Sequence, residues 1–212
     1  MKKQVIFDLD GTITNTLNTS FVGIKKSLEN KTNCQFEDDE IYAGFGLTEE
    51  GIIKSLVGEE IGNVVTEEYY RIFSELLDET TVPFDGMVDL IKELKQQGCI
   101  ISLVTGKGEP SCVNILNKYD IFNLFDAIET GSQIVNRKAE AIEILMHRYN
   151  HNTNDVIYIG DAISDVEECK KVGVKCISAG WAVDTPVDQL NIINAGNVAM
   201  TVADLRDILL EK

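Results

Sequence analysis

Two aspartates, Asp8 and Asp10, stand two residues apart directly after the apolar run at residues 5–7. Carboxylates at the carboxyl end of a buried strand face the crevice in which open α/β sheets bind their ligands. Gly11 follows them, which permits a sharp turn and leaves backbone N–H groups accessible to an anion. Such a pair can supply a nucleophile, a general acid and base, and oxygen ligands for a cation. Taken alone, the same residues also fit an acidic turn after an edge strand.

Residues of complementary chemistry follow in three later stretches. Thr105 and Gly106 end a second apolar run, and Lys138 opens a helical pattern. Asp161 follows a third apolar run, with Asp165 one helical turn beyond it. Each has an ordinary structural alternative: a threonine that ends a strand, a solvated lysine in a first helical turn, and an acid favoured at a helix N-terminus.

The elements that must position these residues alternate along the chain, which predicts an α/β fold with a doubly wound parallel sheet. Short runs rich in valine and isoleucine predict strands at residues 4–8, 99–105, 127–129, 156–161 and 174–178. Amphipathic stretches predict helices at residues 87–96, 110–118, 138–148, 163–172 and 202–210. Gly98 and Gly173 fall just after two of these helices, where a left-handed C-cap is expected.

One segment departs from the alternation, because residues 17–80 show helical periodicity without a convincing strand. We expect a small all-helical insertion here, called the cap below, so that residues 1–16 and 81–212 form the catalytic core. Within it, residues 44–49 place two glycines around Phe45 before a helix start. This loop can approach a ligand and offer backbone donors to an anionic tail, or it can be an ordinary connection with Phe45 in the core of the cap.

Together these stretches resemble, in the same order, the four motifs of the haloacid dehalogenase superfamily. The motifs are the DxD string at Asp8 and Asp10, the threonine motif at Thr105, the lysine at Lys138 and the acidic motif at residues 160–165. The resemblance covers essentially the whole chain and implies this superfamily's core with a helical cap of the C1 type. Asn15, Gly106 and Ala139 depart from the residues that are usual in relatives, and none of the three removes a catalytic group.

What the resemblance implies for catalysis agrees with the chemistry of the residue types. Asp8 would attack phosphorus and form an aspartyl-phosphate, and Asp10 would act as general acid and then base. Mg²⁺ would be held by Asp8, the backbone carbonyl of Asp10 and Asp161. Asp165 would reach the metal through water or hold Lys138.

The phosphate group itself would be bound by residues from two of the motifs. Thr105 would donate its hydroxyl, helped by the backbone N–H groups of Gly106 and Lys107, and Lys138 would neutralise charge. The implied activity is Mg²⁺-dependent hydrolysis of a small phosphorylated metabolite, phosphoglycolate phosphatase-like. A phosphomutase, a pyrophosphatase and a catalytically weak binding protein of the same fold stay open as alternatives.

Composition limits the partners. The formal net charge of −16 argues against binding to nucleic acid or to an anionic membrane. The start of the chain leaves no room for a signal peptide, so we expect a cytoplasmic protein, whose oligomeric state the sequence does not indicate. The five scattered cysteines are interpreted as reduced and mostly buried. We interpret His147 and His151 as surface residues, Trp181 as packing, and the acidic run at residues 37–40 as a solvated helix start.

Overall fold

The centre of the molecule is a six-stranded sheet in the order β3-β2-β1-β4-β5-β6, and its strand pairings are parallel. The computed structural model describes residues 2–80 and 83–210. The strands are β1 (Gln4–Phe7), β2 (Ile100–Val104), β3 (Ala127–Glu129), β4 (Val156–Gly160), β5 (Lys175–Ala179) and β6 (Val198–Ala199). The doubly wound parallel sheet predicted from the alternating pattern is therefore confirmed.

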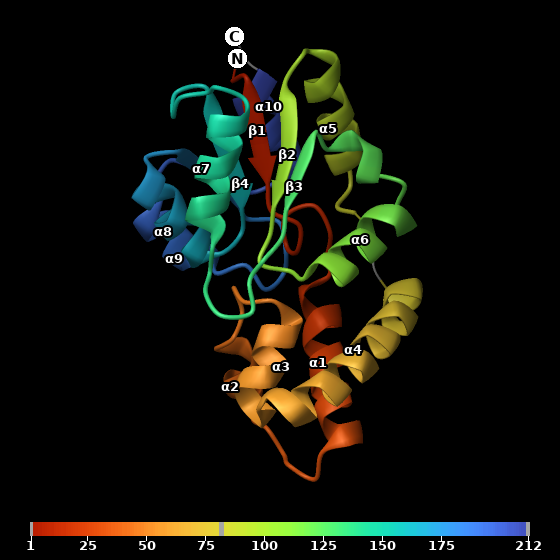
Figure 1. The fold of residues 1–212 in the computed structure, drawn as a ribbon. Coiled ribbons are helices and arrows are strands. Elements are labelled where there is room, and N and C mark those ends of the chain that lie inside the picture. Colours follow the sequence, from red (N-terminus) through yellow and green to blue (C-terminus); the bar gives the residue numbers. More distant parts are fainter. Residues whose placement is uncertain (1, 81–82, 211–212) are drawn as a thin grey trace.

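Helices cover both faces of this sheet (Figure 1). Successive side chains of a strand point to opposite faces, so Val5 and Phe7 of β1 join one hydrophobic cluster and Ile6 joins the other. The first cluster includes residues of α5 (Met87–Gln96), α6 (Glu109–Lys118) and α10 (Val202–Leu210). The second includes residues of α7 (Lys138–Arg148), α8 (Ile163–Val172) and α9 (Val187–Ile193). A 3₁₀ turn, η1 (Phe122–Leu124), precedes β3.

Four helices form the predicted insertion between β1 and α5: α1 (Leu17–Lys31), α2 (Asp38–Tyr42), α3 (Glu49–Val57) and α4 (Glu59–Thr80). They lie beyond the carboxyl ends of the strands, where they cover one end of the sheet (Figure 1). Phe21, Ile24 and Tyr69 belong to the same hydrophobic cluster as one face of the sheet, so the cap shares its packing with the core. The predicted boundary at residues 80–81 falls partly outside the described residues.

The predicted elements are found with small shifts at their ends. The predicted strands at residues 4–8, 99–105 and 156–161 each end one residue earlier in the structure, because Asp8, Thr105 and Asp161 leave the ladder and enter loops. Four of the five predicted helices outside the cap have the predicted bounds, and the helix at 110–118 begins one residue earlier. Both glycines adopt the expected positive φ, 84° at Gly98 and 70° at Gly173. Three short elements, α9, η1 and β6, have no counterpart among the predicted helices and strands.

The residues without a predicted site role mostly behave as expected. None of the five cysteines forms a disulfide, and all except Cys34 are buried. Trp181 is half-buried and donates its indole N–H to the Thr12 carbonyl at 3.0 Å. His147 is exposed, but the surface interpretation of His151 was wrong, since that ring is half-buried with Nδ1 3.0 Å from Gln4 Oε1. Within residues 2–80 and 83–210, no helix is long and apolar enough to cross a membrane.

Candidate active site

The carboxyl ends of three adjacent strands bring the predicted site residues to one edge of the sheet. Asp8 follows β1, Thr105 follows β2 and Asp161 follows β4. Because β1 pairs with both β2 and β4, with Phe7 opposite Leu103 and Ile159, the three residues emerge side by side. They line a cavity of about 340 Å³ between the sheet and the cap, together with Asp10, Gly106 and Lys138. Its volume is at the small end of the range for metabolite sites.

A sharp turn after Asp8 lets Asp161 approach this end of the sheet. Gly11 adopts a φ of 74°, and a Cβ atom at this position would lie only 2.2 Å from a carboxylate oxygen of Asp161. Thr12 donates its hydroxyl to the other oxygen of Asp161 at 3.2 Å. Only glycine satisfies both the left-handed backbone and the close contact, which is the physical reason for glycine after the two aspartates.

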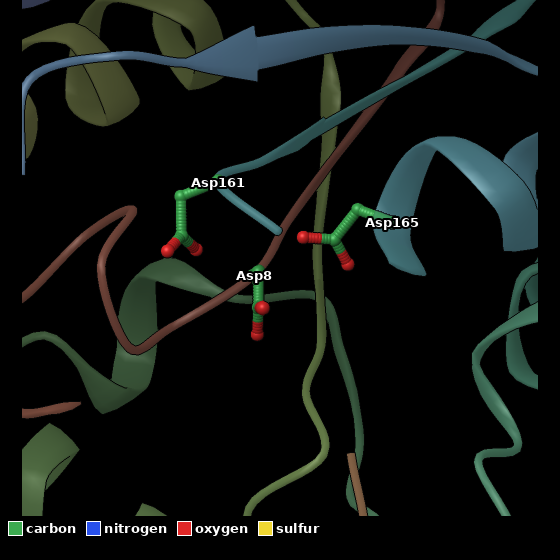
Figure 2. Close-up of side chains that lie close together, drawn as sticks. All are labelled: Asp8, Asp161 and Asp165. Atoms are coloured by element: carbon green, nitrogen blue, oxygen red, sulfur yellow. The ribbon is translucent and has the colours of Figure 1, made fainter. Parts of the chain in front are cut away.

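Lys138 lies among three buried carboxylates, and we call this group the Lys138 cluster. Its ammonium is 2.6 Å from Asp8 Oδ2 and 2.5 Å from Asp165 Oδ1. Lys138 and Asp165 are positioned by the first turns of two helices, since Lys138 opens α7 and Asp165 lies in the first turn of α8. The carboxylates of Asp8, Asp161 and Asp165 lie within 4.8 Å of one another and point toward one region from three parts of the chain (Figure 2).

The charges of this cluster are not balanced by the protein. Burial raises the pKa of Asp8 to about 6 although Lys138 opposes the change. Burial, together with repulsion from Asp165 and Asp8, also raises the pKa of Asp161 well above its usual value. Burial lowers the pKa of Lys138, but Asp165 and Asp8 outweigh it and the net shift is upward. Three carboxylates against one ammonium leave an excess of negative charge that a bound divalent cation would neutralise, so the oxygen donors present fit a metal site.

The Asp10 side chain binds residues outside the Lys138 cluster. Its side chain accepts a hydrogen bond from Thr16 Oγ1, and its Oδ2 lies 3.2 Å from Lys107 Nζ. A side chain so placed lines the cavity on the side of the cap, as a general acid for a leaving group must. The predicted contact between a metal and the Asp10 backbone carbonyl stays a prediction.

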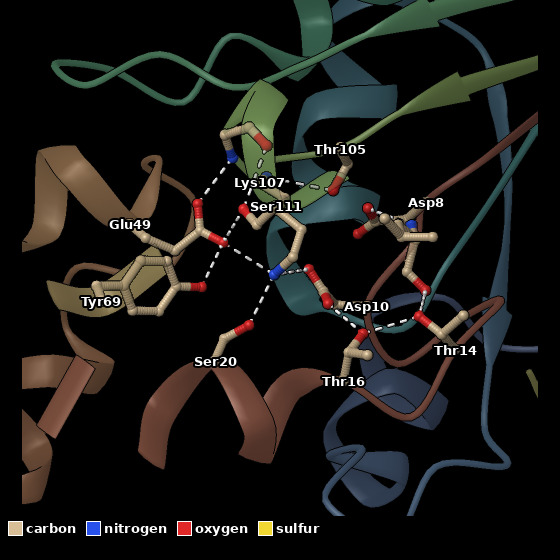
Figure 3. Close-up of polar contacts among 12 residues, drawn as sticks. Asp8, Asp10, Thr14, Thr16, Ser20, Glu49, Tyr69, Thr105, Lys107 and Ser111 are labelled. Atoms are coloured by element: carbon tan, nitrogen blue, oxygen red, sulfur yellow. Dashed lines mark hydrogen bonds and ion pairs between the residues drawn. The ribbon is translucent and has the colours of Figure 1, made fainter. Parts of the chain in front are cut away.

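A second buried lysine, Lys107, whose backbone N–H but not its side chain was predicted to act in the site, joins the cap to the core (Figure 3). Lys107 Nζ is 2.9 Å from Glu49 Oε1, and both side chains are almost fully buried. Glu49 comes from the first turn of α3 in the cap, and it also accepts hydrogen bonds from Tyr69 Oη at 2.9 Å, Ser111 Oγ at 2.7 Å and the Gly108 N–H at 2.8 Å. We call these residues, with Asp10 and Ser20, the Lys107 cluster.

The threonine motif forms a local hydrogen bond in the structure. The Lys107 N–H donates to Thr105 Oγ1 at 3.2 Å, and its predicted contact with a phosphate group stays a prediction. The Thr105 hydroxyl keeps its own proton for a ligand and lies beside the cavity. Gly106 faces the cap, because a Cβ there would come within 3.3 Å of the Gly46 backbone.

The loop before α3 closes over the cavity. Phe45, Gly46 and Leu47 line it, and Phe45 also packs edge-on against Tyr42 with ring centroids 5.4 Å apart. The predicted supply of backbone donors is largely used within the protein: the N–H groups of Phe45, Leu47 and Thr48 bind the carbonyls of Tyr42, Gly44 and Ser132. Thr48 serves as the N-cap of α3 by accepting the Gly51 N–H at 3.1 Å.

Comparison with known families decides the class of this protein. Residues 5–179 match the family model described as haloacid dehalogenase-like hydrolase. The chain belongs to the haloacid dehalogenase-like hydrolases. Sequence similarity to a phosphoglycolate phosphatase of Pseudomonas putida amounts to 24% identity over 99% of this chain and 79% of that protein.

Two solved structures show the same fold over nearly the whole length of this chain. A predicted phosphoglycolate phosphatase from Haemophilus somnus aligns with a TM-score of 0.80 at 18% identity, over 98% of both chains. CbbY from Rhodobacter sphaeroides in complex with phosphate aligns with a TM-score of 0.77 at 16% identity, over 97% of this chain and 96% of that one. The haloacid dehalogenase-like fold, with its sheet and helical insertion, therefore extends over the whole described chain.

Proposed function

We propose that this haloacid dehalogenase-like hydrolase cleaves a small phosphomonoester through an aspartyl-phosphate on Asp8. The observation that carries the proposal is the position of Asp8. Its carboxylate is buried at a strand end, held 2.6 Å from Lys138 Nζ and open to a cavity that the cap closes. The name of the Pseudomonas putida relative and the phosphate complex of CbbY give further support for phosphoryl chemistry.

In the first step a carboxylate oxygen of Asp8 attacks phosphorus while the bond from phosphorus to the leaving oxygen breaks. Asp10 donates a proton to that oxygen, so the alcohol leaves as a neutral molecule. Lys138 stabilises the negative charge on the phosphoryl oxygens, and the Thr105 hydroxyl donates to one of them. Asp8 is then esterified and carries no charge of its own.

In the second step water attacks the phosphorus of the aspartyl-phosphate. Asp10, now deprotonated, takes a proton from this water, and the bond from phosphorus to the Asp8 oxygen breaks. Inorganic phosphate is released and the Asp8 carboxylate is restored. The two steps need one group that gives and then takes a proton, and Asp10 on the cap side of the cavity is suited to both.

A divalent cation is proposed as the cofactor, with Mg²⁺ the first candidate because its ligands are oxygen atoms. Asp8 and Asp161 would hold it directly, together with the Asp10 carbonyl, while Asp165 would fix Lys138 and complete the charge balance. When bound, the cation would screen the repulsion between the nucleophile and the phosphate ester.

The test is hydrolysis of p-nitrophenyl phosphate by the purified protein with and without Mg²⁺, followed by a panel of natural phosphomonoesters that includes 2-phosphoglycolate, pyrophosphate and hexose phosphates. The Asp10→Asn variant is expected to be slowed about 10²- to 10⁴-fold, with a phosphorylated protein detected by mass spectrometry at Asp8. An active enzyme that never carries phosphate on Asp8 under these conditions would refute the covalent mechanism.

A further inference from the structure

Among the described residues that line the cavity on the side of the cap there is one lysine, Lys107, and each of its donors is already in use. An ammonium group has three N–H donors. Those of Lys107 meet Ser20 Oγ at 2.7 Å, Glu49 Oε1 at 2.9 Å and Asp10 Oδ2 at 3.2 Å. Lys107 is 5% exposed and lies over the Phe73 ring at 4.8 Å, so it cannot turn toward a ligand without leaving a buried position.

Glu49 is held as firmly as the lysine that it neutralises. Besides Lys107 it accepts hydrogen bonds from two hydroxyl groups and one backbone N–H, and it is 3% exposed. The pair therefore places no unsatisfied donor toward the cavity. The nearby loop adds few donors, because the N–H groups of Phe45, Leu47 and Thr48 are bonded within the protein.

The charges around the cavity also disfavour a ligand with an additional negative charge. Among the described residues that line it, the charged side chains are Lys107 and Lys138 against Asp8, Asp10, Glu49 and Asp161. A divalent cation and a phosphate dianion add charges that cancel, and Asp10 is protonated in the proposed first step, so a surplus of one negative charge stays. Much of the remaining wall on the cap side is apolar, formed by Leu17, Ile24, Phe45, Leu47 and Ile52.

We infer that the cavity selects phosphomonoesters whose leaving group carries no second negative charge, and that Glu49 sets this selectivity by occupying Lys107. The inference rests on the proposed phosphatase activity and narrows its substrate class to esters of short uncharged alcohols. The inferred substrate class differs from phosphoglycolate, the substrate in the name of the Pseudomonas putida relative, because the leaving group of phosphoglycolate has a carboxylate. A carboxylate in this cavity would meet the charged Glu49 without a cation of its own, since Glu49 already occupies Lys107.

Two esters of matched size test the inference: 2-phosphoglycolate and the phosphate ester of glycolamide, which replaces the carboxylate by a neutral amide. We expect the wild-type protein to favour the amide by about ten-fold or more in kcat/KM, the penalty of one uncompensated charge a few ångströms from others. In the Glu49→Gln variant the positive charge of Lys107 is no longer neutralised by Glu49, so the ratio of kcat/KM for the two esters should move about ten-fold toward the carboxylate.

The Glu50→Gln variant is the matched control, because Glu50 is the next residue of α3 and pairs instead with Lys54 at 2.7 Å. This variant also removes one negative charge from α3, but it does not release Lys107. Its ratio of kcat/KM for the two esters should therefore stay near that of the wild type. Thermal melting checks that each variant is folded. If Glu49→Gln does not fold, the wild-type preference between the two esters decides the inference alone.

Calorimetric binding of both esters to the Asp8→Asn variant with Mg²⁺ present separates this inference from the proposed function. Tighter binding of the amide supports the inference even if no ester is hydrolysed by the wild type, an outcome that would refute only the phosphatase activity. The inference is overturned if 2-phosphoglycolate is preferred, if Glu49→Gln shifts the ratio no more than Glu50→Gln, or if neither ester binds.

Discussion

Two lysines of the described residues, Lys107 and Lys138, are buried beside the same cavity but in different electrostatic conditions. In the Lys138 cluster one ammonium faces three carboxylates, and the pKa values of Asp8 and Asp161 are raised. In the Lys107 cluster burial raises the pKa of Glu49, yet Lys107 and hydrogen bonds from Ser111 and the Gly108 N–H outweigh it and the net shift is downward. The oxygen donors of the first cluster fit a further cation, whereas the second is complete in the sense that every donor of its lysine is bonded within the protein. This difference suits the first to catalysis and the second to joining the cap to the core.

The largest expected effect comes from removing the nucleophile. Asp8→Asn should reduce turnover of p-nitrophenyl phosphate by at least about 10⁴-fold, since the amide cannot attack phosphorus. Stability without metal should change by less than about 1 kcal/mol, or about 4 °C in Tm, because a repelling charge and a partner of Lys138 are lost together. Turnover near that of the wild type, after contaminating phosphatase is excluded, would contradict the assignment of Asp8.

Metal removal tests the unbalanced charge of the Lys138 cluster directly. Exhaustive treatment with EDTA should abolish activity and added Mg²⁺ should restore it. Mg²⁺ at about 100 times its Kd should also stabilise the wild type by about 2.7 kcal/mol, measured by thermal melting.

Two variants locate the metal effect. Asp161→Asn should lose most of this Mg²⁺-dependent stabilisation, while Asp188→Asn, which removes an exposed acid on α9, should keep it. Activity that survives chelation, or equal stabilisation of Asp161→Asn and the wild type, would remove the metal from the Lys138 cluster.

Breaking the complete cluster should cost stability. Lys107→Met leaves Glu49 buried without its cation, which should lower the free energy of unfolding by about 3–5 kcal/mol in urea titrations. Adding Glu49→Leu to that variant should recover only part of the loss, because the buried charge is removed but the Tyr69 and Ser111 hydroxyls and the Gly108 N–H lose their acceptor. Glu93→Gln is the control, since its pair with Arg206 at 2.9 Å is exposed and should contribute at most about 1 kcal/mol. Equal losses for both pairs would show that burial does not distinguish them.

Most of the fold follows from the sequence because its strands are apolar runs and its helices are amphipathic. The elements that were missed are short. β6 (Val198–Ala199) has two residues and pairs only with β5, so no periodicity can identify it. α9 (Val187–Ile193) spans about two turns after Pro186, too few for a helical pattern to stand out from a loop.

The site residues that were predicted share one property: they lie at strand ends or in first helical turns, where a local motif marks them. Glu49 and Lys107 carry no such mark, since a glutamate opening a helix is ordinarily favoured by the helix dipole and solvated. Their pairing depends on how the cap lies against the core, which a single sequence does not encode in a local pattern.

The lowered pKa of Glu49 gives the complete cluster a dependence on pH. A carboxyl group whose folded pKa lies below its usual value of 4.5 stabilises the protein above that pH and loses this contribution as pH falls through the folded pKa. The difference in unfolding free energy between wild type and Glu49→Gln should therefore be constant near neutral pH and shrink below about pH 4.5. Urea titrations from pH 7 to pH 3.5 measure it. A difference that grows as the solution becomes acidic would contradict the pairing.

The smallest expected effects separate two neighbours in the loop that closes the cavity. Thr48→Ala removes the N-cap of α3, so it should lower stability by about 1 kcal/mol and change kcat/KM by a similar factor for every ester. Phe45→Ala opens the cavity wall, so it should change kcat/KM unequally across an ester panel and least for p-nitrophenyl phosphate. Phe45 also packs on Tyr42, which makes some loss of stability common to both variants. The measurement is therefore how widely the ratio of variant to wild-type kcat/KM varies across the esters, and not the mean of that ratio. Equal spreads for the two variants would show that Phe45 only packs the cap, and selectivity would then depend on the charges of the Lys107 cluster.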